Sequence, residues 1–322
     1  MDVPIAEEAP GARQDDRCYP LFGIVPIINT PFDDELRIDV RSLERHIEQS
    51  IADGIVGCIV PAVASEVEKL TLDERKALVE VVTSVAAGRI QVIAGASSDD
   101  VGECCLLADH ALKAGCDGVL CRVPFGLSQD EDGIVAFFRE VAGAGMDMLM
   151  IQDLAWGGQG MKLELIMDLF AAIPSFRCLK IETVPPGLKY TQVLDATKGR
   201  LHVSCGWGMT QMIEALDRGV HAFNSTAINT PFVRIYELHR GGRREEARAL
   251  FERLVPALAW SHQHIDISIQ FLKHYCHRRG LFATANVRQS VLQYDRYHER
   301  CGEEYLELVF ALEDEIAATR TR

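Results

Sequence analysis

The 322-residue sequence has no long hydrophobic run and a shortage of positive charge, and both absences restrict what the protein is. No apolar segment approaches the roughly 18 residues that a membrane-spanning helix requires. Residues 1–8 have neither the basic start nor the apolar stretch of a secretory signal peptide. With 33 Lys and Arg against 47 Asp and Glu, the net charge of −14 disfavours nucleic acid and anionic membrane surfaces as partners. We therefore expect a cytoplasmic protein.

Motifs for cofactor and metal binding are also missing. The chain contains no Gly-x-Gly-x-x-Gly segment, the fingerprint of dinucleotide-binding sheets. Its 10 cysteines lack Cys-x-x-Cys spacing and are expected to be reduced, buried thiols. The histidines at positions 262, 264, 274 and 277 have no acidic or thiolate partner at a spacing typical of metal sites, which favours surface or packing roles. We expect no metal and no cofactor.

What the sequence does contain is a repeated alternation of short apolar runs and amphipathic segments. The apolar runs have the length and composition of fully buried strands. They occupy residues 22–28, 57–60, 90–94, 118–122, 148–152, 178–181, 201–204 and 222–225. Helical periodicity is found at 39–52, 71–87, 101–114, 130–143, 163–172, 191–196, 209–217 and 231–239. Thr71 and Glu74 have the spacing of a helix capping box.

This alternation predicts an α/β fold with a parallel sheet, because parallel strands need a crossover connection. Eight strand–helix units match a closed (β/α)8 TIM barrel. An open doubly wound sheet is the alternative, but its glycine-rich turn is missing after the first run. Beyond residue 242 the strand pattern stops, and 245–258, 265–278 and 305–318 predict helices. We expect a mobile N-terminal arm (1–18), the barrel (19–241) and a C-terminal helical extension (242–322).

In such a barrel the chemistry takes place at the carboxyl ends of the strands, where one lysine, Lys180, stands out. A charged lysine inside an apolar strand is costly to bury, so one interpretation is a neutral amine that forms a Schiff base with a carbonyl compound. The other is a structural lysine paired with a carboxylate such as Glu182 or Asp153. Spacing alone does not separate the two interpretations.

Other polar residues follow predicted strands. Glu66 is expected to cap loop amides, and Asp153 either positions a water molecule or pairs with Lys180. Arg122 either clamps a substrate carboxylate or pairs with a neighbouring side chain. The aromatic residues Trp156 and Phe223 are candidates for the walls of a substrate pocket.

The order of elements and the lysine position resemble the dihydrodipicolinate synthase / N-acetylneuraminate lyase family over residues 23–288. The markers are 23–32 (GIVPIINTPF), Glu66 with 70–75 (LTLDER), 93–95 (IAG), 114–119 (AGCDGV), Pro124-Phe125, Leu179-Lys180 and Gly206. The resemblance implies a TIM barrel in which Lys180 forms the Schiff base with an α-keto acid. It also implies a homo-oligomer, a dimer or a tetramer.

The sequence departs from the family at its proton relay. The family's Gly-Thr-Thr-Gly-Glu loop stands here as residues 62–66 (AVASE), without either threonine hydroxyl. The tyrosine that shuttles protons is replaced by Gln152, whose amide does not titrate. The second tyrosine of the family's Pro-Tyr-Tyr motif is Gly126, and its substrate-binding arginine is missing from 156–158 (WGG). Dihydrodipicolinate synthesis is therefore not expected.

Two hypotheses remain. The first is a diverged Schiff-base lyase, aldolase or hydratase that acts on an α-keto acid or a related carbonyl compound. Its expected catalytic residues are Lys180, Gln152 and Asp153, and its expected substrate-binding residues are Ala64, Ser65, Glu66, Phe125, Trp156, Glu182, Gly206 and Phe223. The second is a catalytically silent barrel that binds a small metabolite as a sensor or partner protein. The buried lysine favours the enzyme, and the lost hydroxyl groups favour the silent barrel.

Overall fold

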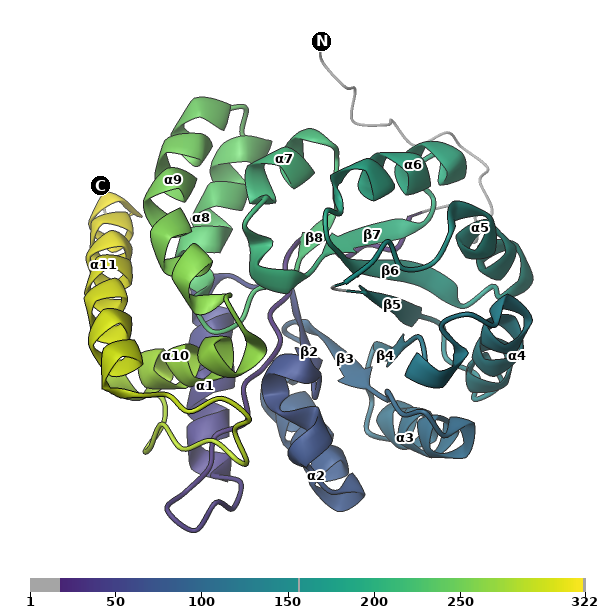
Figure 1. Cartoon of the computed structure of the whole chain (residues 1–322), viewed down its shortest axis with the longest axis horizontal. Coiled ribbons are helices and arrows are strands. Elements are labelled where there is room, and N and C mark those ends of the chain that lie inside the picture. The colour runs from purple at the N-terminus through teal and green to yellow at the C-terminus, as the bar shows by residue number, and fades with distance from the viewer. Residues whose placement is uncertain (1–17, 156, 321–322) are drawn as a thin grey trace.

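The computed structural model describes residues 18–155 and 157–320, and a ring of parallel strands lies at its centre (Figure 1). The strands are β1 (Gly23–Ile24), β2 (Gly57–Val60), β3 (Gln91–Gly95), β4 (Gly118–Arg122), β5 (Leu149–Ala155), β6 (Phe176–Thr183), β7 (His202–Cys205) and β8 (Ala222–Phe223). They form an 8-stranded sheet in the order β1-β8-β7-β6-β5-β4-β3-β2. An isolated parallel bridge between Ile27 and Ile59 joins the two ends of the sheet. The predicted (β/α)8 TIM barrel is confirmed.

Helices surround the barrel, and three more follow it at one side (Figure 1). The helices are α1 (Val40–Asp53), α2 (Leu72–Ala86), α3 (Val101–Lys113), α4 (Glu131–Ala142), α5 (Leu163–Ala172), α6 (Gly187–Thr197), α7 (Met212–Asp217), α8 (Asn229–Arg240), α9 (Arg244–Ser261), α10 (Ile265–Arg278) and α11 (Arg296–Arg320). The predicted capping box is present, because the Glu74 amide donates to Thr71 Oγ1 at 3.2 Å and the Thr71 amide donates to Glu74 Oε2 at 2.9 Å. Across the described part of the chain, no helix combines the length and apolarity needed to cross a membrane.

The largest differences from the predicted boundaries occur in three places. The first apolar run contains Pro26, which cannot donate to a ladder; the regular strand stops at Ile24, although Ile27 still donates to the Ser225 carbonyl at 2.9 Å. Helix α11 begins well before the predicted residue 305, because the Asp295 carboxylate caps its first turn. Helix α6 begins at Gly187, earlier than predicted. Residues 1–17 of the expected N-terminal arm lie outside the described residues.

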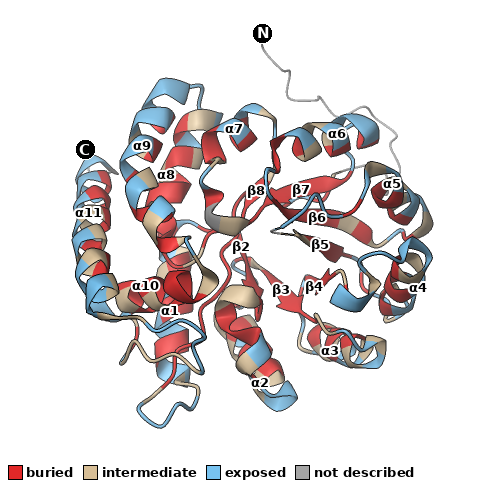
Figure 2. Ribbon diagram, in the orientation of Figure 1, coloured by how far each residue is buried: buried red, intermediate tan, exposed pale blue. Residues whose placement is uncertain are grey.

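The strands are largely buried, as their red colour in Figure 2 shows. Because successive side chains of a strand point to opposite faces, each belongs to one of two apolar layers. One layer fills the barrel and includes Met150 and Cys178. The other lies between the strands and the helices and includes Ile181 and Phe223. Residues two positions after Met150 and Cys178 therefore also point into the barrel, and this rule places the side chains of the site described below.

Several buried histidines make the stability of this fold sensitive to acid. Burial lowers the pKa of His46, His221 and His262 to about 4 and that of His202 to about 3. The folded protein therefore binds fewer protons than the unfolded chain between these values and pH 6.5. The free energy of unfolding is expected to fall as the pH drops through this range, by about 1.4 kcal/mol for each pKa unit of one histidine.

The contribution of one histidine is measured with His202→Gln, whose amide still reaches the Leu21 carbonyl that His202 Nε2 contacts at 2.6 Å. In urea unfolding at pH 7 and pH 5, this variant should lose less stability on acidification than the parent protein. His264→Asn, which keeps a capping group at a half-exposed helix start, is the control and should retain the parent's pH dependence. An identical pH dependence in His202→Gln would contradict the assignment.

Candidate functional site

Lys180 lies in the middle of β6 with its side chain inside the barrel, two residues after Cys178 of the inner layer. Its strand neighbours in register are Gln152 on β5 and Ser204 on β7. The lysine is only 2% exposed, and its Nζ lies 3.2 Å from Glu182 Oε1. The sequence analysis named two carboxylates as partners for Lys180, and the one that pairs with it is Glu182.

Glu182 connects three strands at the mouth of the barrel. Its Oε1 also accepts a hydrogen bond from the Trp207 amide at 3.0 Å, and its Oε2 accepts from the Gln152 side-chain amide. Gly206 makes this position possible, because a Cβ at residue 206 would lie 2.2 Å from Glu182 Oε1. The carboxylate is therefore held in one orientation beside the lysine amine, with Gln152 as a donor rather than a proton shuttle.

A cavity of about 50 Å³ opens above this pair. One water molecule needs roughly 10–15 Å³ of such space, so the cavity suits a compound of a few heavy atoms. Its wall comes from the carboxyl ends of strands and from the helices that follow the barrel. The lining residues are Ile27, Val63, Ala64, Lys180, Glu182, Trp207, Met209, Asn224, Ser225, Thr226, Ile228, Phe232, Leu258, Ser261, His262, Ile265, Ser268 and Leu272.

Asp153 and Phe223 do not join this cavity, because both occupy outward positions of their strands. The Asp153 carboxylate is paired with Lys189 and accepts from the Met161 amide at 2.9 Å. Burial raises the pKa of Asp153, and the charge of Lys189 opposes that shift. Phe223 packs against Tyr236 between the barrel and α8, with ring centroids 6.1 Å apart.

One further expected pocket residue, Phe125, does not line this cavity. Phe125 is 58% exposed and stacks under the Arg122 guanidinium at 4.0 Å, at the edge of a second, larger cavity that Asp153 also lines. Arg122 itself is paired with Asp99 at 2.8 Å. Trp156 lies outside the described residues.

The loop after β2 contributes Val63 and Ala64 to the cavity wall, while its polar side chains contact other parts of the protein. Ser65 Oγ donates to the Ile28 carbonyl at 2.5 Å and accepts from the Ala62 amide at 3.0 Å. The Ser65 carbonyl in turn accepts from Thr30 Oγ1 at 2.7 Å. Ser65 is fully buried, so its hydroxyl group shapes the loop rather than facing a ligand.

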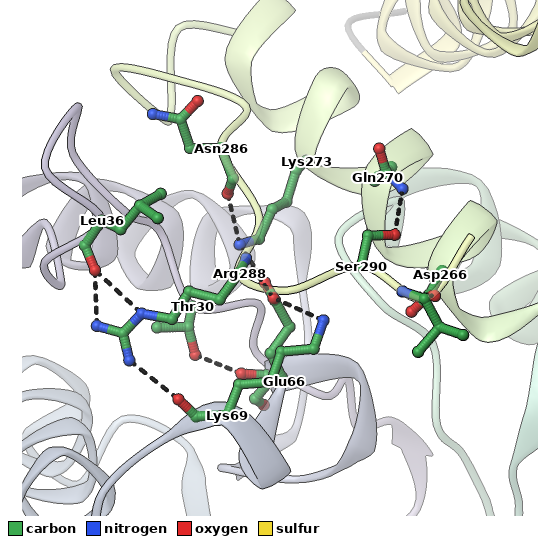
Figure 3. Close-up of polar contacts among 12 residues, drawn as sticks. Thr30, Leu36, Glu66, Lys69, Asp266, Gln270, Lys273, Asn286, Arg288 and Ser290 are labelled. Atoms are coloured by element: carbon green, nitrogen blue, oxygen red, sulfur yellow. Dashed lines mark hydrogen bonds and ion pairs between the residues drawn. The ribbon is translucent and has the colours of Figure 1, made fainter. Parts of the chain in front are cut away.

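Glu66 belongs to a buried ionic network that attaches the C-terminal extension to this loop (Figure 3). Its carboxylate is paired with Lys273 of α10, which is also completely buried, and with Lys69 at 3.2 Å. Glu66 Oε2 accepts from the Arg288 amide at 2.9 Å, and Lys273 Nζ donates to the Asn286 carbonyl at 2.8 Å. The expectation that Glu66 caps loop amides fits this contact with Arg288, whose amide belongs to the distant C-terminal part of the chain.

The sequence of residues 20–307 matches the family model of the Dihydrodipicolinate synthetase family. The chain belongs to this family. A curated relative, the 4-hydroxy-tetrahydrodipicolinate synthase of Agrobacterium fabrum, is 38% identical over 122 residues. That match covers 38% of the chain and 42% of the relative, so it spans less than half of either protein.

Two solved structures share the fold over almost their whole length. The 4-hydroxy-tetrahydrodipicolinate synthase of Methylacidiphilum fumariolicum SolV aligns with a TM-score of 0.83 and 21% identity, covering 92% of this chain and 98% of its own. YagE, a prophage protein of the same family from E. coli K12 in complex with pyruvate, aligns with a TM-score of 0.83 and 20% identity, covering 90% and 99%. At these identities the likeness establishes the architecture alone.

Within the family fold, sequence analysis missed the contribution of the C-terminal extension to the cavity. His262 was assigned a surface or packing role, yet it lines the cavity together with Leu258 and Ser268. Asn224 follows β8 and also lines it. The strand-end position of Asn224 was visible in the sequence, whereas no local pattern indicates that the end of α9 folds over the barrel.

The Glu66–Lys273 pair should dominate the stability of this region. Lys273→Met removes one partner and leaves Glu66 with weaker compensation, which is expected to cost about 3–5 kcal/mol in the free energy of unfolding. The double variant Glu66→Gln/Lys273→Met removes both charges and should lose less than Lys273→Met alone. Urea unfolding at pH 7 measures both changes.

The control is Lys113→Met, whose partner Asp109 lies 2.6 Å away on the protein surface. An exposed pair of this kind contributes less than about 1 kcal/mol. A loss in Lys273→Met no greater than in Lys113→Met would show that the buried pair does not hold the extension in place.

Proposed function

We propose that the protein is a Schiff-base-forming lyase or aldolase that acts on an α-keto acid or a related small carbonyl compound. The observation that carries the proposal is a buried lysine beside a buried carboxylate, at the floor of a cavity in a barrel of this family. The pyruvate complex of YagE supports a keto acid as the kind of ligand. The proposal includes a cytoplasmic homo-oligomer, as the acidic composition and the family resemblance imply.

The Lys180–Glu182 pair supplies the protons that imine formation requires. Transfer of one proton from the ammonium to the carboxylate yields a neutral amine and a carboxylic acid. The amine nitrogen attacks the carbonyl carbon as the carbon–oxygen π bond breaks, and one of the two amine protons passes to the oxygen, which gives a neutral carbinolamine while Glu182 stays protonated. Protonation of that hydroxyl group by Glu182 releases water and leaves the cationic imine, which withdraws electrons from the bond that is formed or broken next.

In this proposal Glu182 takes over the proton transfer that a tyrosine performs in the family, and it does so from a different position in the chain. Gln152 stands where the tyrosine would be, and its amide orients Glu182 without moving a proton. Glu182 lies two residues after Lys180, on the same face of β6. Synthesis of dihydrodipicolinate is not part of the proposal, since the relay hydroxyl groups and the substrate-binding arginine are absent from the matching positions.

Trapping with borohydride tests the lysine directly. Incubation with pyruvate and borohydride should add a single reduced adduct to the intact protein, and peptide mapping should place it on Lys180. Lys180→Ala should abolish the adduct. Lys180→Arg should also abolish it, because a guanidinium stays protonated and does not form an imine.

A panel of small keto acids and aldehydes extends the test beyond pyruvate. Absence of an adduct with every carbonyl compound, combined with tight binding of one of them, would favour the silent metabolite-binding barrel. An adduct that survives Lys180→Ala would assign the nucleophile to another residue.

The role of Glu182 is tested with a matched pair of glycine variants. Gly206→Ala places a methyl group against the Glu182 carboxylate, whereas Gly126→Ala meets nothing within 4 Å. Gly206→Ala and Glu182→Gln should each slow adduct formation by about 10²-fold or more, the scale of general acid–base catalysis. Gly126→Ala should match the parent rate. Equal rates in Gly206→Ala and the parent protein would remove Glu182 from the mechanism.

A further inference from the structure

One wall of the Lys180 cavity presents hydrogen-bond acceptors, and Asn224 supplies the first of them. Its Nδ2 donates to the Val25 carbonyl at 3.0 Å. A carbonyl oxygen only accepts hydrogen bonds, so this contact fixes which way the side-chain amide is turned. The other atom, Asn224 Oδ1, is buried and has no hydrogen-bond partner among the described residues. An unpaired buried acceptor is costly, unless a ligand donates to it.

His262 supplies the second acceptor from the end of α9. Its Nδ1 lies 3.0 Å from the Leu258 carbonyl and 2.9 Å from Ser261 Oγ. The carbonyl only accepts, and Ser261 Oγ donates to it at 3.3 Å, so we assign the ring hydrogen to Nδ1, the tautomer in which both contacts are hydrogen bonds. In this tautomer Nε2 carries the lone pair, and His262 lines the cavity. Burial lowers the pKa of His262 to about 4, so the ring is neutral at physiological pH. The imidazole edge packs against Trp207, with ring centroids 5.6 Å apart.

The rest of the cavity wall does not suit a second anionic group on the ligand. Lys180 is the one lysine among the described lining residues, no arginine accompanies it, and it is already paired with Glu182. The lining is otherwise apolar side chains, hydroxyl groups and the two acceptors. A ligand that satisfies Asn224 and His262 must bring hydrogen-bond donors without negative charge, and alcohol groups meet that requirement.

We propose that Asn224 Oδ1 and His262 Nε2 form a hydroxyl-binding subsite that selects carbonyl substrates bearing an alcohol group near the carbonyl carbon. This inference rests on the proposed function, since Lys180 holds the carbonyl end of the same molecule. The subsite combines the end of β8 with the C-terminal extension. His262 and Asn224 act as specificity-determining residues, and neither is required to form the imine.

The test uses pairs of compounds that differ only by a hydroxyl group in place of a methyl group. The pairs are hydroxypyruvate with 2-oxobutanoate, and 4-hydroxy-2-oxobutanoate with 2-oxopentanoate. Half-saturating concentrations for borohydride trapping are measured for each compound. The hydroxylated member of at least one pair should be trapped at about tenfold lower concentration, the effect of one hydrogen bond worth about 1.4 kcal/mol.

Two variants of His262 separate the acceptor from the packing of the ring. His262→Asn keeps a donor near the Leu258 carbonyl but removes the acceptor, and should reduce the concentration ratio to about one. His262→Gln places an amide oxygen near the position of Nε2 and should restore part of the preference. Asn224→Leu should also reduce the ratio. His274→Asn, on α10 and stacked on Tyr294 outside the cavity, is the control and should keep the parent ratio.

A binding measurement keeps this inference distinct from the proposed function. In Lys180→Ala, which forms no imine, the hydroxylated compound should still raise the melting temperature more than its methyl partner. No adduct in the parent protein, with this preference retained, would refute the Schiff-base proposal and support the subsite. Trapping of both members of both pairs at equal concentrations, with equal shifts in Lys180→Ala, would overturn the subsite and leave the Schiff-base proposal standing.

Discussion

The arrangement of the site depends on one buried ion pair, Glu66 with Lys273. Both side chains are excluded from solvent, and removing two charges from water is costly unless each meets its partner with good geometry. Glu66 belongs to the loop that supplies Ala64 to the cavity, and Lys273 belongs to α10, which supplies Ser268. The loop and the helix therefore reach their positions together. Burial lowers the pKa of Lys273 to about 8, against the opposing effect of Glu66, which shows how strongly the protein interior acts on this charge.

The second pair, Lys180 with Glu182, differs from the first because it lines a cavity. Its members come from one strand at alternate positions, so no docking of distant segments is needed to bring them together. The barrel keeps the carboxylate beside the amine through the Trp207 amide, the Gln152 side chain and the missing side chain of Gly206. The first pair joins the C-terminal extension to the loop after β2, and the second pair faces the cavity.

Much of this arrangement could be predicted from the sequence, because the barrel is encoded by local patterns. Apolar runs at regular intervals identified all the strands, and the alternation of side chains along β6 puts Lys180 and Glu182 on one face. The same alternation, counted from Met150 to Asp153 and from Ala222 to Phe223, excludes those two residues from the barrel interior. That signal was present in the sequence and was not applied to them.

The position of His262 at the cavity could not be predicted from the sequence, for a different reason. Its place at the cavity is determined by how the C-terminal extension docks, and that depends on contacts between residues near opposite ends of the chain, such as Arg288 with Glu66. The orientation of the Asn224 side-chain amide could not be predicted either. It depends on the Val25 carbonyl, which follows β1 and lies beside the end of β8. Sequence periodicity predicts single helices and strands, whereas the positions of these two side chains depend on contacts between elements.

The late position of Lys273 and Arg288 in the chain has a consequence for synthesis of the protein. Translation delivers β1 to β8 before α10, and domains fold in the order in which they leave the ribosome. Until α10 and the segment after it have been made, the Glu66 carboxylate lacks the Lys273 ammonium and the Arg288 amide, and its one partner among these three is Lys69. On the nascent chain the cavity wall beside Lys180 is therefore incomplete until α9 and α10 supply Leu258, His262 and Ser268.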